Sequence, residues 1–220
     1  MLSPADGAVR ATRTHLSARP LSLLPPKRKC ASVTSVVYLL GSLGVGKRTV
    51  GLALSERTGA ICIDNQTVNI PVIGLFGWDG KSSLPGRIWP YIDTIRDAML
   101  SALEHLAPPH LSYVLTNALQ ADRAGEDLFQ RIERIAQRRG ATFAPVVLTC
   151  DRSEQLRRVA SQDRVDRLKL SDPVEAETLI ESSAFYVPSN PNTLTLNTTS
   201  LRPVDAARAI TAHVDKLTLL

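Results

Sequence analysis

The sequence has few of the features that stabilise secreted or metal-binding folds. Only three of its 220 residues are cysteine, and Cys30, Cys62 and Cys150 show no C-x-x-C spacing. An odd number of cysteines without such spacing predicts neither a disulfide framework nor a structural zinc site. Cys62 and Cys150 lie in apolar, strand-like runs, so we expect buried free thiols. A reducing cytoplasm fits this pattern.

Long apolar runs and grouped histidines are also missing. No stretch approaches the roughly 20 apolar residues that span a bilayer. The four histidines are scattered and none follows a predicted strand, so the sequence supports neither a histidine-based catalytic triad nor a histidine metal site. A hydrophobic fraction of 44% and a length of 220 residues predict one soluble domain with a well-filled core.

An excess of positive charge is confined to the beginning of the chain. Residues 1–30 hold six Lys or Arg and one Asp, whereas the remaining 190 hold twenty basic and twenty acidic residues. Proline-rich and without periodicity, residues 1–31 are predicted to form a disordered basic arm. A solvated extension, a transit peptide and a tail for anionic surfaces are the alternatives. Because residues 32–220 are electrically balanced, nucleic-acid binding is not expected.

A glycine-rich segment between an apolar run and a helical pattern is the strongest motif. Residues 36–40 are apolar, and the next seven match G-x-x-x-x-G-K in the strand–loop–helix context of a phosphate-binding P-loop. Successive backbone N–H groups in such a loop surround an anion, and the helix that follows adds its positive end. The predicted nucleotide-binding residues of this loop are Gly41, Ser42, Leu43, Gly44, Val45, Gly46, Lys47, Arg48 and Thr49.

One position of the loop departs from the usual pattern. Arg48 follows Lys47, where Ser or Thr normally offers a hydroxyl to Mg²⁺, and Thr49 comes one place later. Adenylate kinases resemble this arrangement, since their loops also have a non-hydroxyl residue after the lysine and then Thr. Either Thr49 contacts the metal, or neither residue does.

Strand and helix patterns alternate along the rest of the chain. Strands are expected at about 32–40, 60–63, 111–116, 143–149 and 193–197, with helices at about 50–57, 91–106, 127–139, 173–182 and 203–217. Alternation of this kind predicts an α/β three-layer sandwich with a mainly parallel five-stranded sheet. Asp64 ends the second strand, so topology places it near the P-loop.

Two segments between these elements have functional or structural interpretations. Residues 65–90 are irregular and rich in glycine, and form either a substrate-side cap or a plug of the core. Residues 152–172 are unusually charged, and Arg164 and Arg167 share one helical face that could contact a single anion. Interleaved acids also fit a solvated, salt-bridged pair of helices.

The P-loop and the order of elements resemble the small P-loop kinases. Adenylate kinase, shikimate kinase and gluconate kinase belong to this group, and the resemblance extends to bacterial kinase-like proteins called AAA or ATP-binding. It covers residues 33–217 and implies ATP and Mg²⁺ as cofactors, with residues 152–172 as a lid. It also implies that Asp64 orients the acceptor, although Thr116-Asn117 stands where an acid usually follows the third strand.

The resemblance also implies the roles of individual residues. Catalysis is expected from Lys47, Asp64, Arg164 and Arg167, nucleotide contact from Arg157, and metal contact from Thr49 and Asp64. The predicted function is a kinase that transfers the γ-phosphate of ATP to a small-molecule or nucleotide acceptor. A nucleotide-binding sensor or regulatory ATPase is the alternative, and a nucleic-acid kinase that uses the basic arm is a weaker one.

Overall fold

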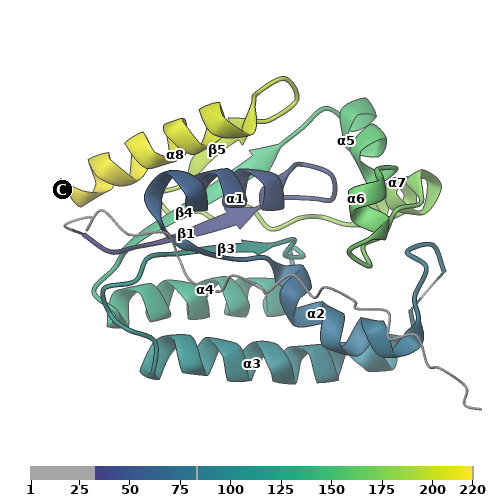
Figure 1. Ribbon diagram of the computed structural model, residues 1–220, viewed down its shortest axis with the longest axis horizontal. Coiled ribbons are helices and arrows are strands. Elements are labelled where there is room, and N and C mark those ends of the chain that lie inside the picture. The colour runs from purple at the N-terminus through teal and green to yellow at the C-terminus, as the bar shows by residue number, and fades with distance from the viewer. Residues whose placement is uncertain (1–32, 83, 220) are drawn as a thin grey trace, which may run out of the picture.

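The structure is a computed structural model that describes residues 33–82 and 84–219 (Figure 1). The predicted basic arm, residues 1–31, lies outside the described residues. The strands are β1 (Ser35–Leu40), β2 (Ile61–Ile63), β3 (Tyr113–Asn117), β4 (Thr142–Thr149) and β5 (Leu194–Asn197). The α-helices are α1 (Lys47–Thr58), α2 (Asn65–Ile73), α3 (Trp89–His105), α4 (Arg123–Arg138), α5 (Arg152–Val159), α6 (Gln162–Val165), α7 (Pro173–Ser182) and α8 (Pro203–Thr218), and the short 3₁₀ helices are η1 (Gly74–Phe76) and η2 (Gly86–Ile88).

The five strands form one parallel sheet in the order β2-β3-β1-β4-β5. The central strand β1 pairs with β3 on one side and β4 on the other, with Tyr38 opposite Leu115 and Pro145. Because helices cover both faces of the sheet, this central strand is buried on both faces, which explains its continuous apolar run. The predicted α/β sandwich is confirmed, and the sheet is entirely parallel among the described strands.

Helices cover both faces of the sheet and give it two cores. In Figure 1, α1 and α8 lie on one face, and α3 and α4 lie on the other. Leu39 and Leu54 belong to the core beneath α1 and α8, while Tyr38 and Ile135 belong to the core above α3 and α4. Alternate residues of β1 therefore point into different layers, as a pleated strand requires.

The segment predicted to be irregular, residues 65–90, begins with a helix. Residues Asn65–Ile73 form α2, in which Val68, Val72 and Ile73 are buried. These side chains pack with Ile92 of α3 in a third hydrophobic cluster. Leu75 and Phe76, by contrast, are exposed. The segment is therefore part core and part surface, and its role as a substrate-side cap stays a prediction.

The charged segment, residues 152–172, forms α5, α6 and a connection to α7 that lie beyond the carboxyl end of the sheet (Figure 1). The two described cysteines, Cys62 and Cys150, are free thiols, but they are half-buried instead of fully buried. No helix within the described residues is both long and apolar enough to cross a membrane.

Candidate active site

Between β1 and α1 the backbone turns through three glycines with positive φ. Gly41, Gly44 and Gly46 have φ angles of 138°, 74° and 87°. A Cβ on Gly41 would lie 2.4 Å from the carbonyl oxygen of Leu148, and one on Gly44 would lie 2.6 Å from that of Gln155. The loop is thus held tightly against β4 and α5, which fixes its N–H groups in place.

Replacing Gly41 with alanine is expected to lower the free energy of unfolding by about 2 kcal/mol or more. The left-handed backbone and the contact with Leu148 both oppose a side chain at this position. Chemical denaturation measures the change. The matched control is Gly86→Ala, because a Cβ on Gly86 meets open space and should change stability by less than about 0.5 kcal/mol. Equal effects of the two substitutions would contradict the packing described for the loop.

Lys47 begins α1 and its side chain turns back over the loop. Its Nζ donates hydrogen bonds to the carbonyl oxygens of Gly41 at 2.8 Å and Ser42 at 2.7 Å. Burial, reinforced by the nearby charges of Arg164 and Lys169, lowers the pKa of Lys47 to about 7, and Asp64 opposes this shift. The ammonium group therefore has carbonyl contacts but, among the residues that the structure describes, no carboxylate within bonding distance, an arrangement that favours an incoming anion.

The lowered pKa of Lys47 predicts that phosphate binding depends on pH. A bound phosphate favours the ammonium form, so the pKa is higher in the complex than in the free protein. ATP should bind most tightly below pH 7, where Lys47 is protonated both in the free protein and in the complex. The affinity should fall as pH rises above 7. Calorimetry of ATP binding at pH 8 in buffers of different ionisation enthalpy should show proton uptake by the protein. Lys47→Arg should abolish the uptake, and uptake that persists in this variant would assign the proton to another group.

Asp64 follows β2 and lies beside the P-loop, as its position in the topology predicts. It is 7% exposed, and its carboxylate accepts hydrogen bonds from Lys169 Nζ and Thr116 Oγ1, each at 2.8 Å. A guanidinium nitrogen of Arg48 lies 3.9 Å away. Burial alone would raise the pKa of Asp64, but Lys169, Thr116 and Arg48 together hold it below its ordinary value. Asp64 is therefore an ionised carboxylate with two cationic neighbours.

The residues around Asp64 do not fit a magnesium ion. Mg²⁺ in phosphate sites takes one or two free protein oxygens besides phosphate and water. The carboxylate of Asp64 is already paired with Lys169, and Arg48 brings a second positive charge. Thr49 lines the cleft, and its contact with a metal stays a prediction. Within the part of the chain that the structure describes, no group of three or more His, Cys, Asp or Glu residues could hold a metal ion.

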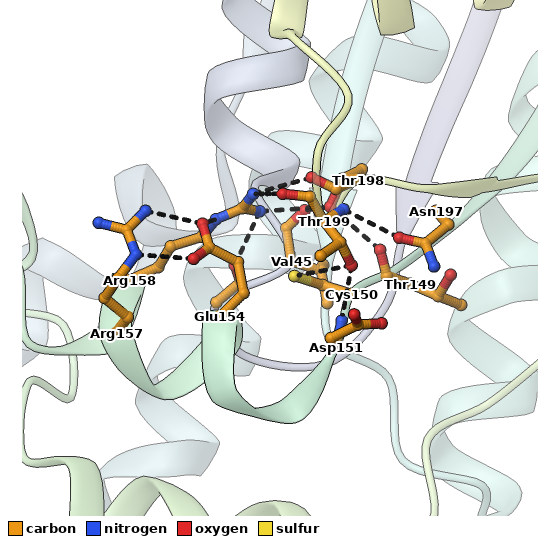
Figure 2. Close-up of polar contacts among 11 residues, drawn as sticks. Val45, Thr149, Cys150, Asp151, Glu154, Arg157, Arg158, Asn197, Thr198 and Thr199 are labelled. Atoms are coloured by element: carbon orange, nitrogen blue, oxygen red, sulfur yellow. Dashed lines mark hydrogen bonds and ion pairs between the residues drawn. The ribbon is translucent and has the colours of Figure 1, made fainter.

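Behind the P-loop, Arg158 of α5 connects three segments (Figure 2). Its guanidinium group donates to the carbonyl oxygens of Thr198 at 2.8 Å and Thr199 at 3.2 Å, and pairs with Glu154 at 2.7 Å. The hydroxyl of Thr198 in turn donates to the carbonyl oxygen of Val45 at 2.9 Å. This network ties α5 and the β5–α8 connection to the loop. The sequence placed Arg158 only within the predicted lid, residues 152–172, because nothing in its sequence surroundings marks these contacts.

The predicted lid arginines take different positions. Arg157 has a side chain that is 73% exposed and pairs with Glu154 at 2.6 Å. Arg164 is partly buried and donates to the carbonyl oxygen of Leu170 at 2.8 Å. Arg167 pairs with Asp163 at 2.9 Å. The predicted common face of Arg164 and Arg167 is thus only partly realised, since α6 ends at Val165 and the two side chains have different partners.

A single cleft of about 1110 Å³ brings these groups together. It is lined by most of the predicted residues, whereas Gly41, Ser42 and Val45 lie behind its surface. Lys169 is the functional candidate that the sequence did not single out. The predicted residues on the lining are Leu43, Gly44, Gly46, Lys47, Arg48, Thr49, Asp64, Arg157, Arg164 and Arg167.

One end of the cleft is lined by amides and aromatic rings that no motif had marked. Asn65, Gln66 and Asn69 come from α2, and Trp78 and Trp89 come from the segments that follow it. The side-chain oxygen of Asn69 is buried and has no hydrogen-bond partner in the described part of the chain. Amide groups and indole rings at this end suit a hydroxylated organic molecule.

Three solved structures share the fold of this chain. A putative kinase from Chloroflexus aurantiacus aligns with a TM-score of 0.58 at 13% identity, over 82% of this chain and 98% of its own. A sugar kinase from Janibacter sp. gives 0.56 at 15% identity, over 83% and 95% of the two chains. A gluconokinase from Sinorhizobium meliloti gives 0.52 at 18% identity, over 87% and 95%.

No protein-family model matches the chain, and no curated protein sequence matches it. The structural likenesses nevertheless agree with one another and with the parallel order of the five strands. The chain has the P-loop kinase fold, and the predicted resemblance to small P-loop kinases is confirmed at the level of the fold.

Proposed function

We propose that this protein is an ATP-dependent phosphotransferase that acts on a small-molecule or nucleotide acceptor. The observation that carries the proposal is the continuity of the cleft, which joins the P-loop and Lys47 to the amide and tryptophan residues on and after α2. A donor and an acceptor could therefore meet without water between them, as phosphoryl transfer requires. Three structural neighbours that carry kinase names support the proposal.

In this proposal the loop amides and Lys47 bind the phosphates of ATP. The oxygen of the acceptor hydroxyl attacks the γ-phosphorus, the bond from that phosphorus to the bridging oxygen breaks, ADP leaves, and the hydroxyl proton is released to solvent. Asp64 orients the acceptor hydroxyl, and Arg164 and Arg167 neutralise the charge that develops on the transferring group. Arg157 contacts the nucleotide after leaving Glu154. Mg²⁺ is not assigned a role, because the residues around Asp64 do not fit it.

The end of the cleft that is lined by the α2 amides, Trp78 and Trp89 is the acceptor end in this proposal. Neutral hydroxylated acceptors fit it best. Its amides can donate to and accept from hydroxyl groups, and its indole rings can cover the apolar face of a sugar or a base. A cytoplasmic enzyme, as the cysteine pattern predicts, would meet such metabolites together with ATP.

Acceptor-stimulated formation of ADP tests the proposal. Purified protein is incubated with ATP and fractions of a metabolite extract, and ADP is measured over time with and without each fraction. We expect at least one fraction to raise ADP formation well above the rate without acceptor. ATP binding with no stimulation by any fraction would contradict the proposal.

The same site has a second candidate function, a nucleotide sensor or regulatory ATPase with little phosphotransfer. The observation that favours it is the double pairing of Asp64, which leaves no free carboxylate near Lys47 to receive a proton. Thr116 and Asn117 at the end of β3 add no acid. Under this alternative ATP binds and the acceptor end of the cleft stays unused.

A further inference from the structure

The cleft holds more positive than negative groups. Eight cationic side chains and four carboxylates line it, an excess of four positive charges. A nucleoside triphosphate without a metal carries about four negative charges at neutral pH, two of them on the terminal phosphate. The cations are Lys47, Arg48, Lys81, Arg157, Arg158, Arg164, Arg167 and Lys169, and the carboxylates are Glu56, Asp64, Asp163 and Glu175.

Two of these cations lie together at the mouth of the P-loop. Arg48 is next to Lys47 in the first turn of α1, and its guanidinium group approaches Asp64 to 3.9 Å. Lys169 reaches the same carboxylate from the α6–α7 connection, at 2.8 Å. One carboxylate thus faces two cations, so Asp64, Arg48 and Lys169 together carry a surplus positive charge beside the phosphate loop.

Lys169 is fixed in position by contacts on both sides. Gln66 donates a side-chain hydrogen bond of 2.6 Å to the carbonyl oxygen of Leu168. The backbone N–H of Ser171 donates to the carbonyl oxygen of Gly80 at 2.9 Å. Leu168 itself has a φ of 50°, which is uncommon for a residue with a side chain. The connection is therefore anchored to α2 and to the turn that follows it, and it carries Lys169 to the P-loop.

A magnesium ion would meet both cations at this place. Arg48 stands at the sequence position where Ser or Thr normally contacts the metal through its hydroxyl. Asp64 is the nearby carboxylate that could bind a metal, and it is paired with Lys169. A divalent ion would be repelled by both cations, and the carboxylate of Asp64, which already accepts hydrogen bonds from Lys169 and Thr116, is not free to bind it. The same two groups suit phosphate oxygens, because guanidinium and ammonium groups form charge-assisted hydrogen bonds with them.

We propose that the protein binds nucleoside triphosphate free of divalent metal, with Arg48 and Lys169 supplying the positive charge that Mg²⁺ supplies in other P-loop proteins. The inference rests on the proposed function, since it concerns the same nucleotide in the same cleft. It goes further in naming the ionic form of the ligand and the two residues that select it.

Calorimetric titration of the full chain with ATP, in excess EDTA and in excess Mg²⁺, tests the inference. The wild type should bind ATP in EDTA at least as tightly as in Mg²⁺. Arg48→Ser, which restores a hydroxyl after Lys47, should weaken binding in EDTA by about tenfold or more and make binding depend on Mg²⁺. The matched control is Arg57→Ser, an exposed position of α1 outside the cleft lining, which should bind as the wild type does.

The possible outcomes separate the inference from the proposed function. Wild-type binding that requires Mg²⁺ would overturn the inference and leave the kinase proposal intact. Equal affinity of Arg48→Ser and the wild type in EDTA would also overturn it, provided that thermal unfolding shows the variant to be folded. Absence of ATP binding in both buffers would overturn the proposed function itself, and the inference with it.

Discussion

Replacing Lys47 with alanine is expected to reduce ATP-dependent turnover by about 10²- to 10³-fold. Lys47 Nζ lies over the loop and, within residues 33–82 and 84–219, bonds only to the carbonyl oxygens of Gly41 and Ser42, so its charge is available to a phosphate. Removing it leaves developing negative charge without its nearest fixed cation. Steady-state ADP formation at saturating ATP measures the loss, and calorimetry measures the accompanying loss of ATP affinity.

The fold of the Lys47→Ala variant should remain intact. Because the side chain makes no ion pair and its burial opposes its charge, alanine should cost little stability. Lys216→Ala on the exposed surface of α8 serves as the matched control and should retain full turnover. Unchanged turnover in Lys47→Ala would contradict the assignment of the cleft as the nucleotide site.

Replacing Asp64 with asparagine is expected to lower both stability and turnover. The change leaves Lys169 and Arg48 partly buried with no carboxylate partner, and breaking a buried ion pair in this way costs about 3 kcal/mol. Turnover should fall by about 10²-fold if Asp64 also orients the acceptor. Chemical denaturation and steady-state kinetics give the two quantities separately.

A double variant separates these two effects of Asp64. Asp64→Asn combined with Lys169→Met removes both members of the 2.8 Å pair and should recover stability relative to Asp64→Asn alone, with a coupling of about 1–3 kcal/mol. Turnover at saturating ATP should stay low, because no group replaces the carboxylate at the acceptor. Recovery of turnover together with stability would show that Asp64 only neutralises Lys169.

Local spacing explains why the nucleotide end of the site could be predicted from sequence. A P-loop is one continuous segment, and Gly41, Gly46 and Lys47 lie at fixed distances along it. Asp64 could be placed because parallel strands end at the same edge of a sheet, and it does lie beside the loop. The continuous apolar run of β1 likewise indicated a strand covered on both faces.

The rest of the site could not be predicted because its contacts join distant segments. Lys169 bonds to a residue 105 positions earlier, and no local pattern distinguishes it from other cations of its charged segment. The helix α2 was missed because Pro71 and two asparagines weaken its helical pattern, and its buried face is explained only by packing against α3. The contacts of Arg158 could not be predicted for the same reason, since its partners Thr198 and Thr199 lie some forty positions away in the sequence.

Transfer of label from γ-³²P-ATP to a small molecule tests the kinase proposal most directly. The full chain is incubated with labelled ATP and a metabolite extract, and products are separated by chromatography, with Lys47→Ala in parallel. We predict a labelled organic product that appears with an equal amount of ADP, and about 10²- to 10³-fold less of it with the variant. Label found only in inorganic phosphate, or retained in ATP, would contradict the assignment of this protein as a kinase.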